Sequence, residues 1–362
     1  MLTQGDDYPL HQTAEPIAFA GTDRNFYDRY FFNGYSLTAG DTRMLAVAFG
    51  VYPQLDIVDA HVCWMANGRQ VNLHAAARAG GERLLMQAGP VRIEVVEPLR
   101  TLRITVDAPD QGITADLTFT GRSFPIEEPR FTRRIGPRTL LDYMRLTQNG
   151  GYDGWVEVDG ERHDVTGFAG TRDRSWGVRP VGARDVQPPP VLPQFFWLWS
   201  PCVFPDRDLF WHSNDDEHGR PWNRRGVVMP AGGAPADERA VDGTAELAWR
   251  PGTRAATAAT LRIDEGEVIF TPVAEFMMLG LGYGHPRWAH GTDHGPLATE
   301  REDFATADLD RSQPQHFHIQ ALSEVRWTDA AGTVRQGRGV LEQLAIGAHA
   351  PSGFTGLADV TP

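Results

Sequence analysis

The sequence predicts an all-β protein built from antiparallel sheets, and three observations lead to this fold class. Short apolar stretches recur along the chain, many with a hydrophobic residue at every second position, which is typical of strands. The 362 residues include 38 glycines and 26 prolines, as a protein with many tight turns requires. Good helix candidates are few. Many short strands at close spacing therefore indicate antiparallel barrels or sandwiches.

The strands are expected where apolar residues alternate with polar ones, or form a short continuous run, between turn residues. Hairpin signals such as Val158-Asp-Gly-Glu-Arg162 occur in both halves of the chain. In order, the expected strands include residues 91–96, 102–106, 114–120, 154–159, 195–200, 208–212, 225–229, 245–249, 260–264, 267–270 and 323–327.

Two domains are expected, because the chain is too long for one small domain. A proline-rich break at residues 187–193 lies near the midpoint and gives domains at 1–186 and 187–362. Residues 230–238 are expected to form an exposed loop. No repeat of short fixed period is present, which disfavours a solenoid or propeller.

Charge and residue usage exclude several classes of function. The net charge is −13 and the pI is about 5.4, which disfavours binding to nucleic acid or to anionic lipid surfaces. All 34 basic residues are arginines. Without lysine, a Schiff-base enzyme and a P-loop nucleotide site are excluded.

The expected setting is cytoplasmic. No apolar run is long enough for an integral membrane segment, and the N-terminus lacks a leader pattern. Cys63 and Cys202 lie in apolar runs and are expected as buried free thiols rather than a disulfide. The sequence leaves a homodimer open.

One stretch carries the strongest chemical signal. Residues 170–180 place Arg172, Asp173 and Arg174 beside Trp176, between glycines. Residues 167–177, Gly-Phe-Ala-Gly-Thr-Arg-Asp-Arg-Ser-Trp-Gly, resemble the signature of the AttH-like proteins, which are relatives of hydroxyneurosporene synthase (carotenoid 1,2-hydratase). Residues 337–344 resemble the closing strand of the same superfamily, and residues 280–294 and 341–356 resemble a bacterial subgroup of it.

The resemblance spans residues 25–356 and implies two tandem lipocalin-like antiparallel β-barrels, packed side by side around an apolar cavity, with no cofactor. The carotenoid hydratases have a histidine on the strand before the signature and a tyrosine two residues before the aspartate. This chain has Thr147-Gln148-Asn149 and Thr171 at those places. Carotenoid hydration itself is therefore not implied.

Asp173 is the leading candidate for a general acid or base. Successive strand residues face opposite sides, so Arg172 and Arg174 are expected to point away from it. The alternative is a structural aspartate that caps a turn or pairs with arginine. Trp176 is a candidate to stabilise a developing cation.

Histidines supply further candidates for the site. His212 lies on a strand-like run, and His285, His290 and His294 lie in a glycine-rich segment that is not expected to be helical. No metal site is predicted. A metal enzyme using this segment, or using His316 and His318 on one strand face, stays an alternative. The candidate substrate-binding aromatic residues are Trp176, Tyr283, Trp288, Trp199 and Trp211.

The leading hypothesis is a cofactor-independent enzyme that transfers protons on a hydrophobic small molecule, such as a terpenoid, steroid-like compound or polyketide. Hydration, dehydration or double-bond isomerisation fits this site. The alternatives are a non-catalytic carrier of an apolar ligand and a histidine-ligated metal enzyme.

Overall fold

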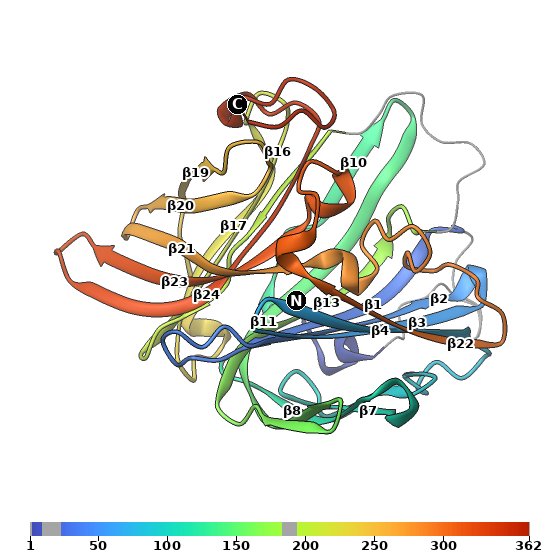
Figure 1. The fold of residues 1–362 in the computed structure, drawn as a ribbon. Coiled ribbons are helices and arrows are strands. Elements are labelled where there is room, and N and C mark those ends of the chain that lie inside the picture. The colour runs from blue at the N-terminus through green and yellow to red at the C-terminus, as the bar shows by residue number, and fades with distance from the viewer. Residues whose placement is uncertain (1, 9–22, 183–193, 362) are drawn as a thin grey trace. The chain divides into compact units, whose positions relative to one another are not determined.

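The computed structural model describes residues 2–8, 23–182 and 194–361, and strands dominate this part of the chain (Figure 1). Contacts divide the chain into two compact units. The first contains residues 1–65, 70–187 and 280–303, and the second contains residues 66–69, 188–279 and 304–362. The segment 280–303 thus belongs to the first unit, although it follows most of the second in the sequence.

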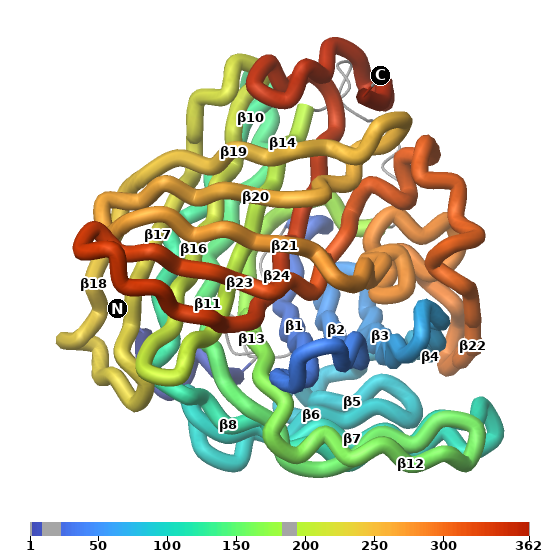
Figure 2. The backbone as a smooth tube through the Cα atoms, turned by 60° about the vertical axis from the view of Figure 1, so that its left-hand side comes forward, coloured from blue at the N-terminus to red at the C-terminus, as the bar shows by residue number. Residues whose placement is uncertain are grey.

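The strands of the first unit form sheet A, in the order β22-β4-β3-β2-β1-β13-β11-β8-β7-β6-β5. Figure 2 shows β5 to β8 lying below β1 to β4, so the sheet curves back as a half-barrel. The strands are β1 (Phe26–Tyr35), β2 (Met44–Tyr52), β3 (Ile57–Ala66), β4 (Arg69–Arg78), β5 (Gln87–Ala88), β6 (Val91–Glu97), β7 (Thr101–Ala108), β8 (Ile113–Gly121), β11 (Arg138–Val158), β13 (Phe168–Val178) and β22 (Leu297–Ala305), with β9 (Ile126–Glu127), β10 (Phe131–Ile135) and β12 (Glu161–Asp164) paired to β11.

The second unit is built on sheet B, in the order β18-β17-β16-β14-β24-β23-β21-β20-β19, with β15 paired to β16 and β24. One side of this sheet covers an apolar core that includes Leu198, Trp211, Phe270 and Trp327. The strands are β14 (Phe195–Trp199), β15 (Cys202–Val203), β16 (Arg207–Asp215), β17 (Pro221–Pro230), β18 (Arg239–Ala240), β19 (Gly243–Trp249), β20 (Ala256–Ile263), β21 (Gly266–Met277), β23 (Ile319–Asp329) and β24 (Val334–Ile346).

The all-β prediction is confirmed, and each strand expected from apolar alternation coincides with a strand of the structure. Helical structure in the described residues is limited to 3-10 turns of three or four residues. No helix among these residues is long and apolar enough to cross a membrane.

The expected proline-rich break at 187–193 lies outside the described residues. Cys63 and Cys202 are buried free thiols, as predicted. The 3-10 turns are η1 (Gln4–Asp7), η2 (Pro53–Leu55), η3 (Pro109–Gln111), η4 (Pro235–Asp237), η5 (Met278–Leu281), η6 (Thr306–Asp308), η7 (Pro314–His316) and η8 (Ala350–Ser352).

The pleat of β13 separates the three charges of the signature. Arg172 is fully buried and donates to Asp7 Oδ1 at 2.5 Å and to Gln148 Oε1 at 2.7 Å. Arg174 is also fully buried, forms an ion pair with Asp28, and donates to the carbonyl oxygen of Tyr8 at 2.8 Å. Both arginines therefore fix the N-terminal segment against one face of sheet A.

A row of four glycines crosses sheet A at the same level. Gly34 on β1 lies opposite Gly170 on β13, which lies opposite Gly150 on β11, which lies opposite Gly121 on β8. Neighbouring side chains occupy the space beside these glycines. A Cβ atom at Gly170 would lie only 2.7 Å from the Tyr152 ring, and one at Gly150 only 2.3 Å from the Phe119 ring. The glycine of the signature therefore has a packing role.

The substitution Gly170→Ala is expected to lower the free energy of unfolding by about 1–3 kcal/mol or more, the usual cost of overpacking a dense core. The added carbon would lie 2.0 Å from the carbonyl oxygen of Asn33, so the backbone must move. Urea unfolding followed by tryptophan fluorescence measures the loss. Gly151→Ala is the control, because its closest contact would be 3.3 Å. Equal stability of the two variants would contradict this account of the glycine row.

Candidate active site

Ionisable side chains from several segments converge on the face of sheet A opposite Arg172 and Arg174. Asp59 and His61 come from β3 and His74 from β4, while His285 and His290 come from the segment 280–303 of the same unit. All five side chains are buried. This group, together with Glu302 on β22, is called the histidine cluster below.

Local sequence explains how these groups meet. Residues two apart on a strand face the same side, so Asp59 and His61 project together from β3. The segment opposite them passes close to β3 at Gly282, where the backbone has φ +89°. A Cβ atom there would lie 2.8 Å from His61 Nε2, so both the conformation and the space favour glycine.

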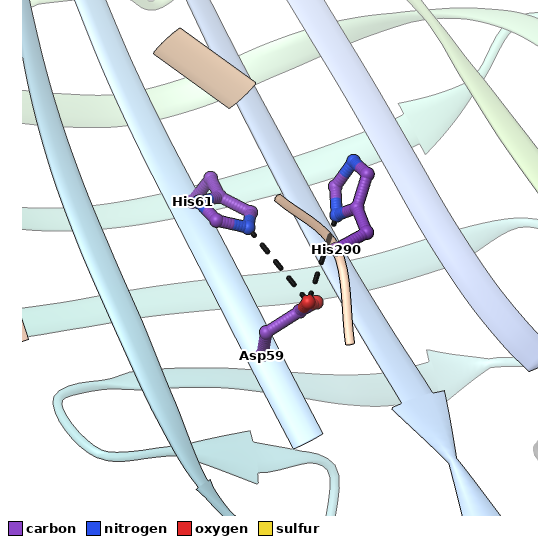
Figure 3. Close-up of side chains that lie close together, drawn as sticks. All are labelled: Asp59, His61 and His290. Carbon is purple, nitrogen blue, oxygen red and sulfur yellow. Dashed lines mark ion pairs between the residues drawn. The ribbon is translucent and has the colours of Figure 1, made fainter. Parts of the chain in front are cut away.

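Two histidines flank the carboxylate of Asp59, as Figure 3 shows. Asp59 Oδ2 lies 3.9 Å from His61 Nε2 and 3.7 Å from His290 Nδ1, which is too long for hydrogen bonds. The same oxygen accepts a hydrogen bond from the backbone N–H of Gly291 at 2.7 Å. His61 Nε2 and both ring nitrogens of His290 have no hydrogen-bond partner among the described residues.

The second half of the cluster is connected to the first through a pair of imidazoles. His61 Nδ1 and His74 Nδ1 lie 2.8 Å apart, so one of them donates to the other. His74 Nε2 lies 3.9 Å from Glu302 Oε2, and His285 Nε2 lies 3.3 Å from the same oxygen. His285 Nδ1 accepts hydrogen bonds from the backbone N–H groups of Trp288, at 2.8 Å, and Arg287, at 3.1 Å.

Burial controls the protonation of this cluster. It lowers the pKa of both His74 and His290 to about 4, so these rings are neutral at pH 7. Burial raises the pKa of Asp59, but His290 and His61 lower it further, and the net pKa lies below its ordinary value. Contact with His285 and His74 holds the pKa of Glu302 well below its usual range. The cluster thus combines ionised carboxylates with neutral imidazoles at His74 and His290.

A buried arginine lies on the same face. Arg29 on β1 is 2% exposed, and its Nε and Nη1 atoms have no hydrogen-bond partner among the described residues. Its guanidinium carbon lies 4.9 Å from the centre of the Tyr283 ring and 5.7 Å from that of Tyr27. The Tyr283 ring in turn packs edge-on against His290 at 4.9 Å. A buried cation with unused donors can bind an anionic or developing negative oxygen.

The chain resembles known proteins in sequence and in fold. A family model described as "Family of unknown function (DUF8625)" matches residues 2–355. The chain belongs to this family. No curated protein matches the DUF8625 chain.

Solved structures that share its fold include the following three. One is described as an AttH from Nitrosomonas europaea, with 15% identity over 92% of this chain and 98% of that chain and a TM-score of 0.53. Kievitone hydratase from Nectria haematococca shows 11% identity over 88% of each chain and a TM-score of 0.53. CghA, solved with Sch210972, shows 11% identity over 89% of each chain and a TM-score of 0.51. The expected AttH-like, tandem lipocalin-like fold is thereby confirmed.

Asp173 lies where the pleat rule predicts. It is buried on β13, opposite Phe31 of β1 and Thr147 of β11, and it faces away from both neighbouring arginines. This face is the one that carries Arg29 and the histidine cluster, because Arg29 lies opposite Ser175, two residues from Asp173. Such diagonal positions on neighbouring strands are about 7–8 Å apart.

The other candidates in the first unit have different surroundings. His285 and His290 belong to the histidine cluster, whereas His294 stacks on Trp288 at 3.9 Å and donates from Nε2 to the carbonyl oxygen of Arg287. Trp288 also stacks on His74 at 5.5 Å and donates to Glu300. Trp176 lies 5.6 Å from the guanidinium carbon of Arg174. The segment 280–294 has no α-helix, as predicted.

The remaining candidates belong to the second unit. His212 is buried on β16, with Nε2 2.8 Å from Asn223 Oδ1. Trp199 packs edge-on against Phe210, and Trp211 is part of the apolar core. The prediction that His316 and His318 share a strand face is wrong, because Pro314–His316 forms a 3-10 turn and β23 begins only at Ile319.

His318 instead contributes to a buried network around Glu342. Glu342 Oε1 lies 2.8 Å from His318 Nε2 and accepts a hydrogen bond from Trp197 Nε1 at 2.8 Å. Its other oxygen accepts from Gln320 Nε2 at 2.5 Å. Both carboxylate oxygens are therefore hydrogen-bonded, which is typical of a structural carboxylate.

Five residues of the first-unit site carry no motif: Arg29, Asp59, His61, His74 and Glu302. A weak signal for three of them exists in the alternations Asp59-Ala60-His61 and Asn72-Leu73-His74. Each places polar side chains on one face of an otherwise apolar strand. Arg29 is likewise a charged residue inside the aromatic strand Phe26–Tyr35.

The substitution Glu342→Gln is expected to lower the free energy of unfolding at pH 7 by about 1–3 kcal/mol, since it disrupts a satisfied buried network. Burial raises the pKa of Glu342, but its contacts, chiefly with His318, outweigh burial and bring the pKa below the ordinary value of 4.5. Its stabilising effect is therefore complete above about pH 4.5 and is lost as the pH falls through the lowered pKa.

Urea unfolding of both proteins at neutral and acidic pH tests this sign. The difference in free energy of unfolding between the wild type and Glu342→Gln should be smaller at acidic pH than at neutral pH. Glu246→Gln is the matched control, because Glu246 is a surface residue paired with Arg262. A difference that becomes larger at acidic pH would contradict the lowered pKa assigned to Glu342.

Proposed function

We propose that this protein is an enzyme that transfers protons on a hydrophobic small molecule, as a hydratase, dehydratase or isomerase. One observation supports this most strongly. Ionisable groups gather on one buried face of sheet A, and several of their polar atoms lack partners among the described residues. A buried polar atom without a partner costs about 1–3 kcal/mol, which favours a functional reason for keeping it.

Arg29 is the proposed electrophilic group. Its Nε and Nη1 donors, which have no partner among the described residues, suit an oxygen that becomes negative during the reaction, such as the oxygen of an enolate. Burial raises the pKa of the Tyr27 and Tyr52 hydroxyls well above 10, so both remain protonated and cannot neutralise the arginine. Burial lowers the pKa of Arg29, but charge interactions through space, including that with the Asp173 carboxylate, raise it, so the proposed site pairs this cation with the proposed acid or base and with the substrate oxygen.

Asp173 is the proposed acid or base. It lies on the same face as Arg29 and on the neighbouring strand, within the span of one small molecule. A carboxylate on one side of a substrate carbon and a guanidinium near its oxygen is a common arrangement for proton abstraction beside a carbonyl group. The His61–His74 pair offers a second route for protons on this face.

The fold comparisons support this reaction class. Kievitone hydratase has the same fold by its TM-score of 0.53, and its name describes a hydratase. CghA was solved with the small molecule Sch210972. Fold likeness alone does not determine a reaction, so the proposal depends on the chemistry of the buried face.

The substitution Asp173→Asn is expected to reduce turnover at least ~100-fold while ligand affinity stays within about threefold, since general acid–base groups contribute about 10²–10⁴ in rate. The substrate is sought by mass spectrometry of molecules that co-purify with the protein and of their analogues. Gain or loss of water, or deuterium uptake from D2O, reports the reaction.

Two further variants separate this role from a structural one. Arg29→Gln should also lose turnover, by about 10²–10³, because it removes a preorganised charge. Glu246→Gln, on the surface of the second unit, should keep full turnover. An Asp173→Asn protein that is folded and fully active would refute the assignment, and a wild type that binds ligand without converting it would favour a carrier.

A further inference from the structure

The histidine cluster contains three groups that face one another without direct hydrogen bonds between them, although the Asp59 carboxylate accepts hydrogen bonds from the backbone N–H of Gly291 at 2.7 Å and from the Tyr52 hydroxyl at 3.4 Å. Asp59, His61 and His290 are each at most 5% exposed and point toward one another (Figure 3). Their ligand atoms all lie within 4.8 Å of one another. We propose that Asp59, His61 and His290 bind one divalent transition-metal ion.

The separations fit shared coordination better than direct contact. Asp59 Oδ2 lies 3.9 Å from His61 Nε2 and 3.7 Å from His290 Nδ1. Two ligands on one tetrahedral ion, with bonds of 2.0–2.2 Å, are separated by about 3.3 Å. The two separations from Asp59 need to shorten by roughly half an ångström around an ion, and the His61 and His290 ligand atoms, which lie within 4.8 Å of each other, by about 1.5 Å at most, within the reach of small side-chain rotations.

The free lone pairs also fit a metal. His61 Nε2 and both nitrogens of His290 have no hydrogen-bond partner among the described residues. Ligation at His61 Nε2 leaves the proton on His61 Nδ1, which can then donate to His74 Nδ1 at 2.8 Å. Metal-binding histidines normally donate their second ring nitrogen to such an acceptor. His74 then carries its own proton on Nε2, directed toward Glu302.

The neighbouring triad of His74, His285 and Glu302 is equally close, but its hydrogen bonds exclude it as a metal site. His285 Nδ1 accepts two backbone N–H groups, so its proton must lie on Nε2. That nitrogen donates to Glu302 and has no lone pair for an ion. This triad instead orients His74 behind the ligand His61.

Two imidazoles and one carboxylate select a borderline ion such as Zn²⁺, Fe²⁺ or Co²⁺ rather than Ca²⁺ or Mg²⁺. Three protein ligands leave at least one coordination position for water or a substrate oxygen. A bound ion would act there as a Lewis acid. Among the three loop histidines, the proposal assigns coordination to His290 and excludes His285 and His294.

Metal titration of the full-length protein tests the site directly. After chelator treatment and dialysis, Co²⁺ is added and its visible absorption followed, while Zn²⁺ affinity is measured by calorimetry. The wild type should bind one equivalent. His290→Ala and Asp59→Asn should weaken binding at least ~100-fold, and His74→Gln, which removes an acceptor behind a ligand, about 10–100-fold.

His294→Ala is the matched control from the same loop, because its ring stacks on Trp288 and its Nε2 donates to a carbonyl group. It should bind Co²⁺ as tightly as the wild type. His61→Gln provides a second ligand variant should His290→Ala fail to fold, with near-ultraviolet circular dichroism reporting folding. The proposal is overturned if the wild type shows no saturable binding or if a folded ligand variant binds normally. Loss of Co²⁺ binding in His285→Ala together with normal binding in a folded His290→Ala would place the ion in the neighbouring triad and would also overturn the proposal.

The experiments on metal binding and on turnover can refute the two proposals independently. Binding is measured without turnover, so its outcome does not depend on knowing the substrate. Asp173→Asn should bind Co²⁺ normally because Asp173 is three strands from His61 in the order β13-β1-β2-β3. A protein that binds metal but does not turn over would refute only the proposed function.

Discussion

The alternating pleat of β13 is the constraint on which the first unit depends. It directs two buried arginines to one side of sheet A and one buried aspartate to the other. On the first side, the guanidinium groups are neutralised by Asp7 and Asp28, and the contacts of Arg172 with Asp7 and of Arg174 with Tyr8 fix the N-terminal segment. On the second side, Asp173 shares a face with Arg29 and the histidines. A single strand thus separates two arginines that pair with carboxylates from the aspartate to which the proposed reaction is assigned.

Glu342 in sheet B and the histidine cluster in sheet A differ in how their polar atoms are satisfied. In sheet B, both oxygens of Glu342 accept hydrogen bonds, which resembles a network selected for stability. In sheet A, Arg29, His61 and His290 retain unused polar atoms among the described residues. Groups of this kind reduce stability, and proteins keep them chiefly at sites that bind or react. Unpaired buried atoms also occur among the described residues of sheet B, for example Trp211 Nε1 and Gln343 Nε2, so the convergence of several ionisable groups, rather than unpaired atoms alone, distinguishes the face of sheet A.

The sequence predicted local structure better than the composition of the site. Strands were predictable because alternation of apolar residues reflects a sheet with different faces, and the orientation of Asp173 followed from the same rule. His285 and His290 were identified by their unusual loop, but their partners were not. Asp59 and Glu302 lie more than 240 residues apart in the sequence; the pairing of β4 with β22 brings Glu302 near His74, and the loop before β22 brings Gly291 to Asp59. Long-range pairing of this kind leaves no periodic signal.

The error at His316 and His318 was local, because Pro314 starts a 3-10 turn where a strand was expected.

The first unit is discontinuous, since residues 280–303 join residues from the first half of the chain. On the ribosome, β1 to β13 emerge well before the segment that carries Tyr283 and His290. During that interval His61 and His74 face a surface whose covering segment does not yet exist. The nascent half-barrel therefore exposes a polar patch, and it is completed only after most of the second unit has been synthesised. Maturation of the site is in this way coupled to the translation of a different unit, so a truncated product lacks the complete cluster even if strands β1 to β13 pair.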